Sequence, residues 1–411
     1  MAQPLIEIDD ARKRILQCAQ RLGEKEAVCL DALGCVLAED IVSDVDSPPH
    51  DKSIVDGYAV ISADLPGGEG ELEILEEIVA GSVPSRALTA GHASRIMTGA
   101  PIPAGTDAVV MLERCQLLAG GEVLGRVRIR DPRLVGGQNV VRRAAAMRTG
   151  ELVLRRGQTL RPLELGLLAE VGRQRVRIVA RPRVAVLSTG DELVPVDCVP
   201  GPAQLRNSNE PMLVACVVRS GGLPQPLGIA RDEREQLRAL IGRGLESADV
   251  LVLSGGVSAG VLDLVPGVLR ELGVEQVFHK VNVKPGKPVW FGVGGGSPAR
   301  LVFGLPGNPV SSLVCFRLFV APALASMSGR SPADLELQPA RLLAGFSQHG
   351  DRPSFQAAAL ARQPDGLTAR PLKTQGSGDL RGLSAANGLA YFPSGERRYE
   401  AGEMIEACWL D

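Results

Sequence analysis

The stretch Val184-Ala-Val-Leu-Ser-Thr-Gly-Asp-Glu-Leu193 decides the fold class of this chain. Its four apolar residues have the length of a short buried strand, and they lead directly into a loop of hydroxyl, glycine and acidic residues. Helical and strand-like runs alternate after it, with helices predicted at 209–220, 233–244, 265–272 and 310–327 and strands at 225–229, 250–253 and 301–303. This alternation over residues 181–328 is typical of a doubly wound α/β domain.

Three polar loops directly follow predicted strands of this domain. They contain Ser188-Thr189-Gly190-Asp191-Glu192, Ser254-Gly255-Gly256-Val-Ser258 and Gly304-Leu-Pro306-Gly307-Asn308-Pro309-Val-Ser311. In doubly wound sheets, ligands bind at the carboxyl ends of strands. Glycine loops let backbone N–H groups approach phosphate oxygens, and a helix start favours negative charge. The loops therefore predict a phosphate site, with Asp191, Glu192 and Asp263 placed to hold a magnesium ion.

A lysine cluster lies between the second and third loops. Three of the seven lysines in the chain, Lys280, Lys284 and Lys287, fall within eight positions, whereas most other basic residues are arginine. Compact ammonium groups suit a phosphorylated or other anionic ligand. The cluster therefore supports an enzyme that handles anions.

Each of these features has a simpler explanation when it is taken singly. A Gly-Gly pair after a strand is commonly a turn, Asp-Glu after Thr-Gly commonly caps a helix, and Pro-Gly-Lys-Pro is typical of a surface turn. The coincidence of three such loops at strand ends of one domain favours the functional interpretation.

The remainder of the chain predicts a multidomain protein. Helical spacing at 8–23 and a second helical run at 28–39 precede a β-rich texture at 45–138. Mixed texture follows at 139–180, with a helix at 162–171, and the last segment is strand-like and rich in turns. We expect a discontinuous N-terminal domain (1–44 and 139–180), an inserted β-rich module (45–138), the α/β domain (181–328) and a C-terminal β domain (333–411).

Composition excludes several classes of protein. The hydrophobic share of 45% is that of a globular protein. The net charge is −2 and the pI is about 6.2, so the chain lacks the overall positive charge that attracts nucleic acid. The eight cysteines and four histidines are scattered and predict neither a zinc site nor a disulfide framework. No apolar stretch approaches the roughly 20 residues needed to cross a bilayer. We therefore expect a cytoplasmic protein with no membrane partner.

Two further motifs occur in the N-terminal half. Asp46-Ser-Pro-Pro-His-Asp-Lys-Ser-Ile-Val-Asp56-Gly-Tyr-Ala59 surrounds a tight turn with acids, and Arg95-Ile-Met-Thr98-Gly-Ala-Pro-Ile-Pro103 places a hydroxyl beside a glycine. In isolation, both are explained as loops that enter strands.

Together, these motifs resemble the molybdopterin molybdenumtransferase family, which includes the bacterial MoeA proteins and the gephyrin E domain. The resemblance rests on seven segments that run in the family's order over nearly the whole chain. They are Pro48–Ala59, Met97–Pro103, Ser188–Leu193, Asn207–Glu210, Ser254–Asp263, Val283–Pro288 and Gly304–Ser311.

The resemblance implies a homodimer of four-domain subunits in which residues 181–328 form a MogA-like α/β domain that binds molybdopterin. The implied reaction consumes adenylylated molybdopterin and molybdate with magnesium, inserts the metal into the dithiolene, and releases AMP and molybdenum cofactor. A MogA-like adenylyltransferase and molybdoenzyme apoproteins are the implied protein partners.

Site residues are carried over position by position. The resemblance implies activity for Asp56 and Thr98, which in the family's dimer come from the partner subunit. It implies catalytic roles for Asp191, Glu192, Asp232 and Asp263, with Asp191, Glu192 and Asp263 as magnesium ligands. The residues implied to bind substrate are Ser188, Thr189, Gly190, Ser254, Gly255, Gly256, Ser258, Lys280, Lys284, Lys287, Pro306, Gly307, Asn308, Pro309 and Ser311.

Several positions depart from the family pattern. Ala144-Ala-Ala146 stands where Gly-Glu-Asp is usual, His50 and Lys52 stand where Phe and Asn are common, and Ala357 and Gly382 stand where an arginine and a serine are expected. These departures motivate a second hypothesis, a paralogue that binds or carries molybdopterin or its molybdenum cofactor with little or no insertion. A third hypothesis, an adenylyltransferase, is disfavoured by the long N-terminal half and the C-terminal β domain.

Overall fold

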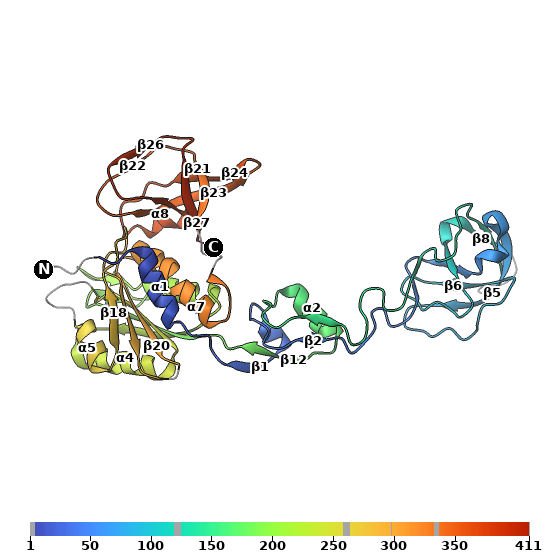
Figure 1. The fold of residues 1–411 in the computed structure, drawn as a ribbon, viewed down its shortest axis with the longest axis horizontal. Coiled ribbons are helices and arrows are strands. Elements are labelled where there is room, and N and C mark those ends of the chain that lie inside the picture. Colours follow the sequence, from blue (N-terminus) through green and yellow to red (C-terminus); the bar gives the residue numbers. More distant parts are fainter. Residues whose placement is uncertain (1–4, 119–124, 258–263, 297, 333–336, 411) are drawn as a thin grey trace. The chain divides into compact units, whose positions relative to one another are not determined.

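The computed structural model describes residues 5–118, 125–257, 264–296, 298–332 and 337–410 (Figure 1). The chain divides into two compact units. The first contains Met1–Ala38, Gly157–Arg161 and Arg175–Asp411, and the second contains Glu39–Arg156 and Pro162–Gln174. Each unit is described by itself.

A six-stranded sheet forms the centre of the first unit, with the strand order β16-β13-β17-β20-β19-β18. Neighbours among the first four strands are parallel, and β19 and β18 are antiparallel to their neighbours. The strands are β13 (Arg183–Thr189), β16 (Leu223–Ala230), β17 (Val250–Ser254), β18 (Glu275–His279), β19 (Trp290–Gly294) and β20 (Arg300–Leu305).

Helices cover both faces of this sheet because its central strands are apolar on both sides. Along β13, Val184 and Val186 contribute to one buried cluster, whereas Ala185 and Leu187 contribute to another. The first cluster contains α1, α3 and the helical segment that ends in α7, and the second contains α4 and α5. The bounds are α1 (Ile8–Cys18), α3 (Asn209–Arg219), α4 (Arg234–Ser247) and α5 (Val265–Glu271). The doubly wound α/β class predicted from the sequence is confirmed.

A continuous helical segment follows β20. It consists of α6 (Pro309–Cys315), a π turn η5 (Phe316–Val320) and α7 (Ala321–Met327). By length and composition this 19-residue segment could cross a membrane, so the expectation that no apolar stretch approaches that length was wrong. Since 78% of its most apolar window is buried inside the protein, the segment is packed as a core helix.

The last part of the first unit is a closed barrel with the order β21-β24-β23-β25-β27. Its strands are β21 (Gln338–Leu342), β23 (Ser354–Gln363), β24 (Gly366–Pro371), β25 (Gly388–Phe392) and β27 (Met404–Trp409). The pair β22 (Phe346–Gln348) and β26 (Arg397–Tyr399) and the short helix α8 (Leu380–Ser384) complete it. Two further pairs belong to this unit, β1 (Glu24–Val28) with β12 (Arg175–Val179) and β14 (Leu193–Val194) with β15 (Leu205–Arg206).

The second unit contains a six-stranded sheet with the order β7-β4-β6-β5-β9-β8. Its strands are β4 (Gly57–Val60), β5 (Glu69–Ile78), β6 (His92–Ile96), β7 (Ala108–Met111), β8 (Cys115–Leu118) and β9 (Arg126–Arg130). Two short pairs, β2 (Ile41–Val42) with β11 (Leu152–Leu154) and β3 (Lys52–Ser53) with β10 (Val140–Val141), precede helix α2 (Pro162–Glu170). The β-rich texture and the helix expected near 162–171 are confirmed.

Two expected helices near the N-terminus differ from the structure. The first ends at Cys18 rather than at residue 23. The second, at 28–39, was wrong: Glu24–Val28 is a strand paired with β12, and only a 3-10 turn, η1 (Cys29–Ala32), follows it. Gly34 then takes a positive φ of 74°, a conformation that does not continue a helix.

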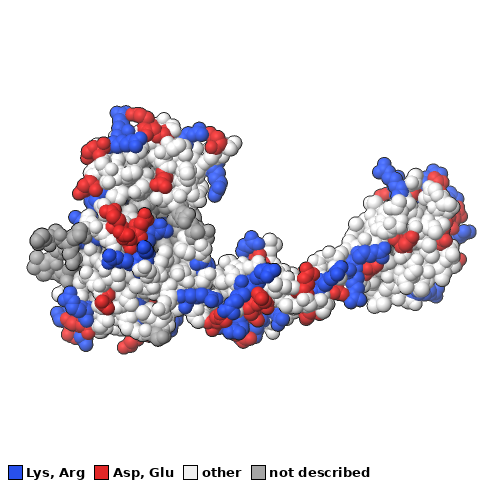
Figure 2. All heavy atoms as spheres, in the orientation of Figure 1, with Lys and Arg blue, Asp and Glu red and all other residues white. Residues whose placement is uncertain are grey.

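Charged side chains of both signs are interspersed over the face shown in Figure 2. Several of them pair across neighbouring strands: Arg128 with Glu71 and Arg130 with Glu69 between β9 and β5, and Arg177 with Glu24 between β12 and β1. Such exposed pairs contribute little to stability individually.

Candidate functional site

A cavity of about 610 Å³ opens at the carboxyl ends of the parallel strands in the first unit. The strands β13, β17 and β20 end there at Thr189, Ser254 and Leu305. All three predicted loops contribute to the wall, which is the position that the α/β topology favours for a ligand. The lining residues are Thr189, Gly190, Glu192, Leu193, Leu205, Arg206, Asn207, Ser208, Asn209, Asp232, Gly255, Gly256, Val257, Pro288, Pro306, Gly307, Asn308, Pro309, Gly378 and Leu380.

The loop after β17 requires its two glycines. Gly255 and Gly256 have φ values of +92° and +63°, and a Cβ on Gly255 would overlap the carbonyl oxygen of Thr189. A Cβ on Gly256 would lie 2.7 Å from both Thr189 Oγ1 and a Val265 methyl carbon. Here the glycines allow one strand-end loop to pack directly on another.

Two asparagines join the three loops through buried hydrogen bonds. Asn207 Oδ1 accepts from Ser188 Oγ at 2.9 Å. Asn209 Nδ2 donates to Ser254 Oγ at 2.6 Å and to the carbonyl oxygen of Gly307 at 2.7 Å. These bonds fix the loops after β13, β17 and β20 relative to one another, so the wall of the cavity is held in one arrangement.

Of the predicted acidic residues, Glu192 and Asp232 line the cavity, whereas Asp191 lies next to Glu192 without lining it. Asp191, Glu192 and Asp232 are exposed, and the Asp232 backbone N–H donates to Asp191 Oδ1 at 3.1 Å. The Arg231 guanidinium donates to the carbonyl oxygens of Asp191 and Leu193 at 2.6 and 3.0 Å, and so fixes the backbone of the acidic loop.

A magnesium ion fits these acidic residues in one particular mode. Among the described residues, no group of three or more His, Cys, Asp or Glu side chains is arranged to hold a metal ion. Mg²⁺ in phosphate-handling enzymes is commonly held by one or two carboxylates together with substrate phosphates and water. Asp191 and Glu192 provide carboxylates for that mode, whereas Asp263 and Ser258 lie outside the residues that the structure describes.

The three lysines of the cluster lie on the connection between β18 and β19, and none of them lines the cavity, although the neighbouring Pro288 does. Lys284 is tied to the barrel, because its N–H donates to Pro353 and its carbonyl accepts from Phe355. Its Nζ lies 3.5 Å from the carbonyl oxygen of His349. The structure thus places Lys284 beside the barrel and leaves all three lysines out of the wall of the cavity.

The C-terminal barrel segment contributes to the wall through the loop before α8. Asn308 Nδ2 donates to Ser377 Oγ at 2.9 Å, and the Val310 N–H donates to the Ser377 carbonyl at 3.1 Å. Gly378 and Leu380 line the cavity. This polar contribution was not anticipated, although the glycine- and hydroxyl-rich run Thr374-Gln-Gly-Ser-Gly378 was its signal in the sequence.

The second unit brings Asp56 and Thr98 together. Asp56 Oδ1 accepts from the Thr98 N–H at 2.7 Å and from Thr98 Oγ1 at 2.8 Å. These two hydrogen bonds, backbone first, lower the pKa of Asp56 from its ordinary value, so the carboxylate stays ionised well into the acidic range. The pair is exposed and acts chemically as one group, an oriented carboxylate with a neighbouring hydroxyl.

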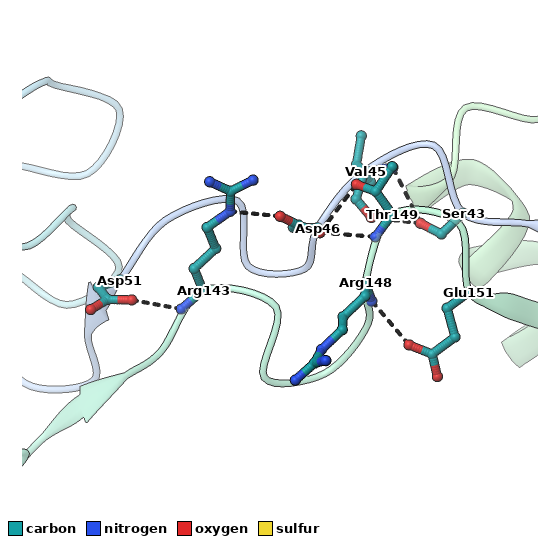
Figure 3. Close-up of polar contacts among 8 residues, drawn as sticks. All are labelled: Ser43, Val45, Asp46, Asp51, Arg143, Arg148, Thr149 and Glu151. Atoms are coloured by element: carbon teal, nitrogen blue, oxygen red, sulfur yellow. Dashed lines mark hydrogen bonds and ion pairs between the residues drawn. The ribbon is translucent and has the colours of Figure 1, made fainter.

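The run Ala144–Ala146 lies alongside the segment 46–51 in the same unit, because the N–H groups of Ala144 and Ala146 donate to the carbonyls of Pro48 and Ser47. Figure 3 shows the polar side chains on either side of this run. Arg143 donates from its N–H to Asp51 at 2.7 Å and from Nε to Asp46 at 2.6 Å, and Thr149 also donates to Asp46. Ala144 has a φ of +58°, and its N–H donates to the Pro48 carbonyl. The two chain segments are therefore joined by the neighbours of the alanines and by backbone groups.

Comparisons with known proteins match the whole of this architecture. The MoeA N-terminal region (domain I and II) matches residues 6–172, the probable molybdopterin binding domain matches 185–326, and the MoeA C-terminal region (domain IV) matches 339–410. A molybdopterin molybdenumtransferase of Staphylococcus aureus is 32% identical over 408 residues, covering 98% of this chain and 94% of the relative. The chain belongs to the molybdopterin molybdenumtransferase family.

Further relatives agree with this family. The molybdopterin molybdenumtransferase of Bacillus subtilis is 33% identical over 409 residues, with 98% and 93% coverage. The crystal structure of the molybdopterin biosynthesis MoeA protein from Pyrococcus horikosii has a TM-score of 0.78 at 32% identity, covering 99% of this chain and all of that one. Every loop of the cavity that precedes the barrel falls within the region matched by the probable molybdopterin binding domain.

Two departures from the family pattern have local explanations. Ala357 is buried and packs in a small apolar cluster with Val310 and Leu383. A Cβ on Gly382 would lie 2.5 Å from Oδ2 of Asp379, whose other carboxylate oxygen, Oδ1, accepts from the Gly382 N–H at 2.8 Å. An added side chain at residue 382 would therefore displace the cap of α8.

Proposed function

We propose that this chain inserts molybdenum into molybdopterin during biosynthesis of the molybdenum cofactor, with adenylylated molybdopterin and molybdate as substrates and AMP as a product. The observation that carries the proposal is the cavity of three strand-end loops within the region that matches the molybdopterin binding domain. Its glycine loops and the start of α6 suit phosphate groups. A cavity of about 610 Å³ is large enough to enclose much of a nucleotide-sized ligand.

In this proposal, the strand-end loops hold the phosphates, and Asp191 and Glu192 hold Mg²⁺. A bound Mg²⁺ would supply neutralising charge to the phosphate oxygens. Asp232 orients Asp191 through its N–H, and the phosphate-facing wall is formed by Thr189, Gly190, Gly255, Gly256 and Pro306 to Pro309. Ser188 and Ser254 support this wall through their bonds to Asn207 and Asn209, and Ser311 is buried behind it in α6. Asp263 and Ser258 keep the roles that the family resemblance implies.

Lys280, Lys284 and Lys287 are proposed to attract the anionic substrates. Positive charge beside a cavity raises the local concentration of an oxyanion such as molybdate. The place of Lys284 beside the barrel supports a role in approach and charge neutralisation, because its ammonium group is exposed rather than enclosed.

We also propose that the chain acts as a homodimer in which Asp56 and Thr98 serve the cavity of the other subunit. The ionised carboxylate and adjacent hydroxyl of this pair support a catalytic role. The proposal also includes the four-domain division expected from the sequence and a cytoplasmic location. A MogA-like protein would supply the adenylate, and molybdoenzyme apoproteins would receive the cofactor. The separate sheets of residues 57–130, 183–305 and 338–409 support the division.

The decisive experiment supplies pure protein with adenylylated molybdopterin, molybdate and Mg²⁺. Formation of active cofactor is measured by reconstitution of a molybdenum-free molybdoenzyme, and AMP is measured in the same reaction. Equal release of AMP and cofactor supports a transferase. Tight ligand binding without AMP release supports the carrier hypothesis instead, and ATP consumption with molybdopterin alone would indicate an adenylyltransferase.

Subunit mixing tests the dimer. Asp56→Asn and Asp191→Asn subunits, each inactive alone, are allowed to exchange. If sites are shared between subunits, mixed dimers regain one intact site, and about a quarter of wild-type activity returns. No recovery after verified exchange contradicts the shared site and leaves the transferase proposal standing.

A further inference from the structure

Asn209 leaves one polar atom of its side chain without a partner. The residue begins α3, is only 8% exposed and lines the cavity. Its Nδ2 uses both protons, on Ser254 Oγ and on the Gly307 carbonyl. Its Oδ1 is buried and has no hydrogen-bond partner among the described residues.

The orientation of this amide is fixed by its surroundings. The carbonyl oxygen of Gly307 can only accept a hydrogen bond, so the nitrogen of Asn209 must face it. A flipped amide would place two acceptors against each other at 2.7 Å. The oxygen is therefore the atom that remains free.

A second buried polar atom belongs to a residue of the same cavity wall. Thr189 is 3% exposed and lines the cavity, and its Oγ1 also has no partner among the described residues. Native structures seldom leave buried polar atoms unpaired without a functional reason. Two such atoms in one wall indicate that a bound ligand completes their hydrogen bonds.

The chemistry of Asn209 Oδ1 selects the part of the ligand that it contacts. An amide oxygen only accepts, so it pairs with an O–H or N–H group and not with an ionised phosphate oxygen. The same side chain bridges the loops at Ser254 and Gly307, where the phosphates are proposed to bind. In a 5′-nucleotide, the hydroxyls of the ribose are the donors separated from the phosphate by the fewest bonds.

We infer that Asn209 Oδ1 accepts a hydrogen bond from a ribose hydroxyl of the adenylate, which makes Asn209 a specificity-determining residue for the nucleotide half of the substrate. The inference rests on the proposed function, because that function supplies the adenylate. A divalent cation is the other partner that an amide oxygen takes. Both groups that Asn209 contacts are uncharged, however, and no carboxylate within the described part of the chain bonds to either group.

The test compares ligands that differ by one hydroxyl. Binding of AMP, 2′-deoxy-AMP and 3′-deoxy-AMP is measured by calorimetry with the wild type, Asn209→Ala and Asn207→Ala. Asn207 is the matched control, because it is a buried asparagine of the same cavity wall whose oxygen already accepts from Ser188. Loosening of the loops weakens the binding of all three ligands by a similar factor. Loss of the inferred hydrogen bond instead changes the ratio of the AMP affinity to the affinity of one deoxy ligand.

One deoxy ligand is expected to bind the wild type about 3- to 10-fold more weakly than AMP, as for the loss of one neutral hydrogen bond. This ratio falls to about one in Asn209→Ala and persists in Asn207→Ala.

Equal binding of all three ligands by the wild type overturns the inference without any variant, and so does a ratio that survives Asn209→Ala. A ratio that disappears on removal of Mg²⁺ overturns it in favour of a metal contact. Failure of the wild type to bind AMP at all overturns the proposed use of an adenylate as well.

Discussion

Replacing Gly256 with alanine tests how tightly the strand-end loops are packed. The new Cβ would lie 2.7 Å from Thr189 Oγ1 and from a methyl carbon of Val265, both of which are buried. Holding alanine at a φ of +63° costs about 1–2 kcal/mol, and overpacking a rigid site costs about 1–3 kcal/mol more. The expected loss of unfolding free energy is therefore about 2–5 kcal/mol, with cofactor formation falling because Thr189 is displaced.

Gly273 provides the matched control for this change. It has a similar φ of +77°, but a Cβ there meets nothing within 4 Å, so only the conformational cost of about 1–2 kcal/mol remains. Thermal unfolding of both variants measures the difference, at roughly 2–4 °C per kcal/mol for a unit of this size. Equal shifts for Gly256→Ala and Gly273→Ala would show that the loops are not packed as described.

Three further changes have defined outcomes. Ala144→Gly relieves a φ of +58° and should raise the unfolding free energy by up to about 1 kcal/mol in urea unfolding; a lower stability would refute the strain. Thr98→Val removes one of two hydrogen bonds that lower the pKa of Asp56, so a carboxyl NMR titration should show a higher pKa that is still depressed. The stabilisation lost with that bond is present above the ordinary carboxyl pKa and disappears as pH falls through the folded value. Arg231→Gln frees the backbone of Asp191 and should raise the Mg²⁺ concentration for half-maximal AMP release about tenfold. An unchanged Mg²⁺ concentration would show that Arg231 does not help to position the metal-binding carboxylates.

The sequence could predict the α/β core because its signals are local. Buried parallel strands read as apolar runs such as Val184–Leu187, and the loops that follow them contain glycines that the backbone requires. The antiparallel strands β18 and β19 were not predicted. Glu275–His279 is mostly polar at its start and Trp290–Gly294 contains two glycines, so their pairing depends on the neighbouring β20 rather than on propensity.

The helix expected at 28–39 failed for a related reason. Its apolar spacing is real, since Cys29, Ala32, Val36 and Leu37 are all buried. The backbone instead pairs with partners more than a hundred residues away, as in the bridges Val36–Thr159 and Leu37–Ile178. Tertiary pairing overrides periodicity here, and sequence spacing alone does not reveal a partner so distant in the chain.

The site was predictable by residue type but not by arrangement. Asn207 and Asn209 stood in a recognised motif, yet their roles depend on bonds to Ser188, Ser254 and Gly307 that form only in the folded domain. The lysine cluster shows the converse. Its composition indicated an anion site, whereas the structure places Lys284 beside the barrel, and the charged side chains that line the cavity are those of Glu192, Arg206 and Asp232.

The departures from the family pattern bear on the choice between transferase and carrier. Gly382 preserves the cap of α8 and Ala357 fills an apolar cluster, so both belong to packing beneath the cavity loop. Ser377 from the same segment still bonds Asn308 in the wall. Ala145 and Ala146 remove two carboxyls that the family usually has, but these positions are exposed and lie in the unit that contains an intact Asp56–Thr98 pair. Replacing Ala145 with Glu and Ala146 with Asp therefore tests whether the missing carboxyls limit insertion. A rise in turnover with unchanged ligand affinity would locate a catalytic deficit at these two positions. Unchanged turnover would show that carboxyl side chains at these positions are dispensable for insertion.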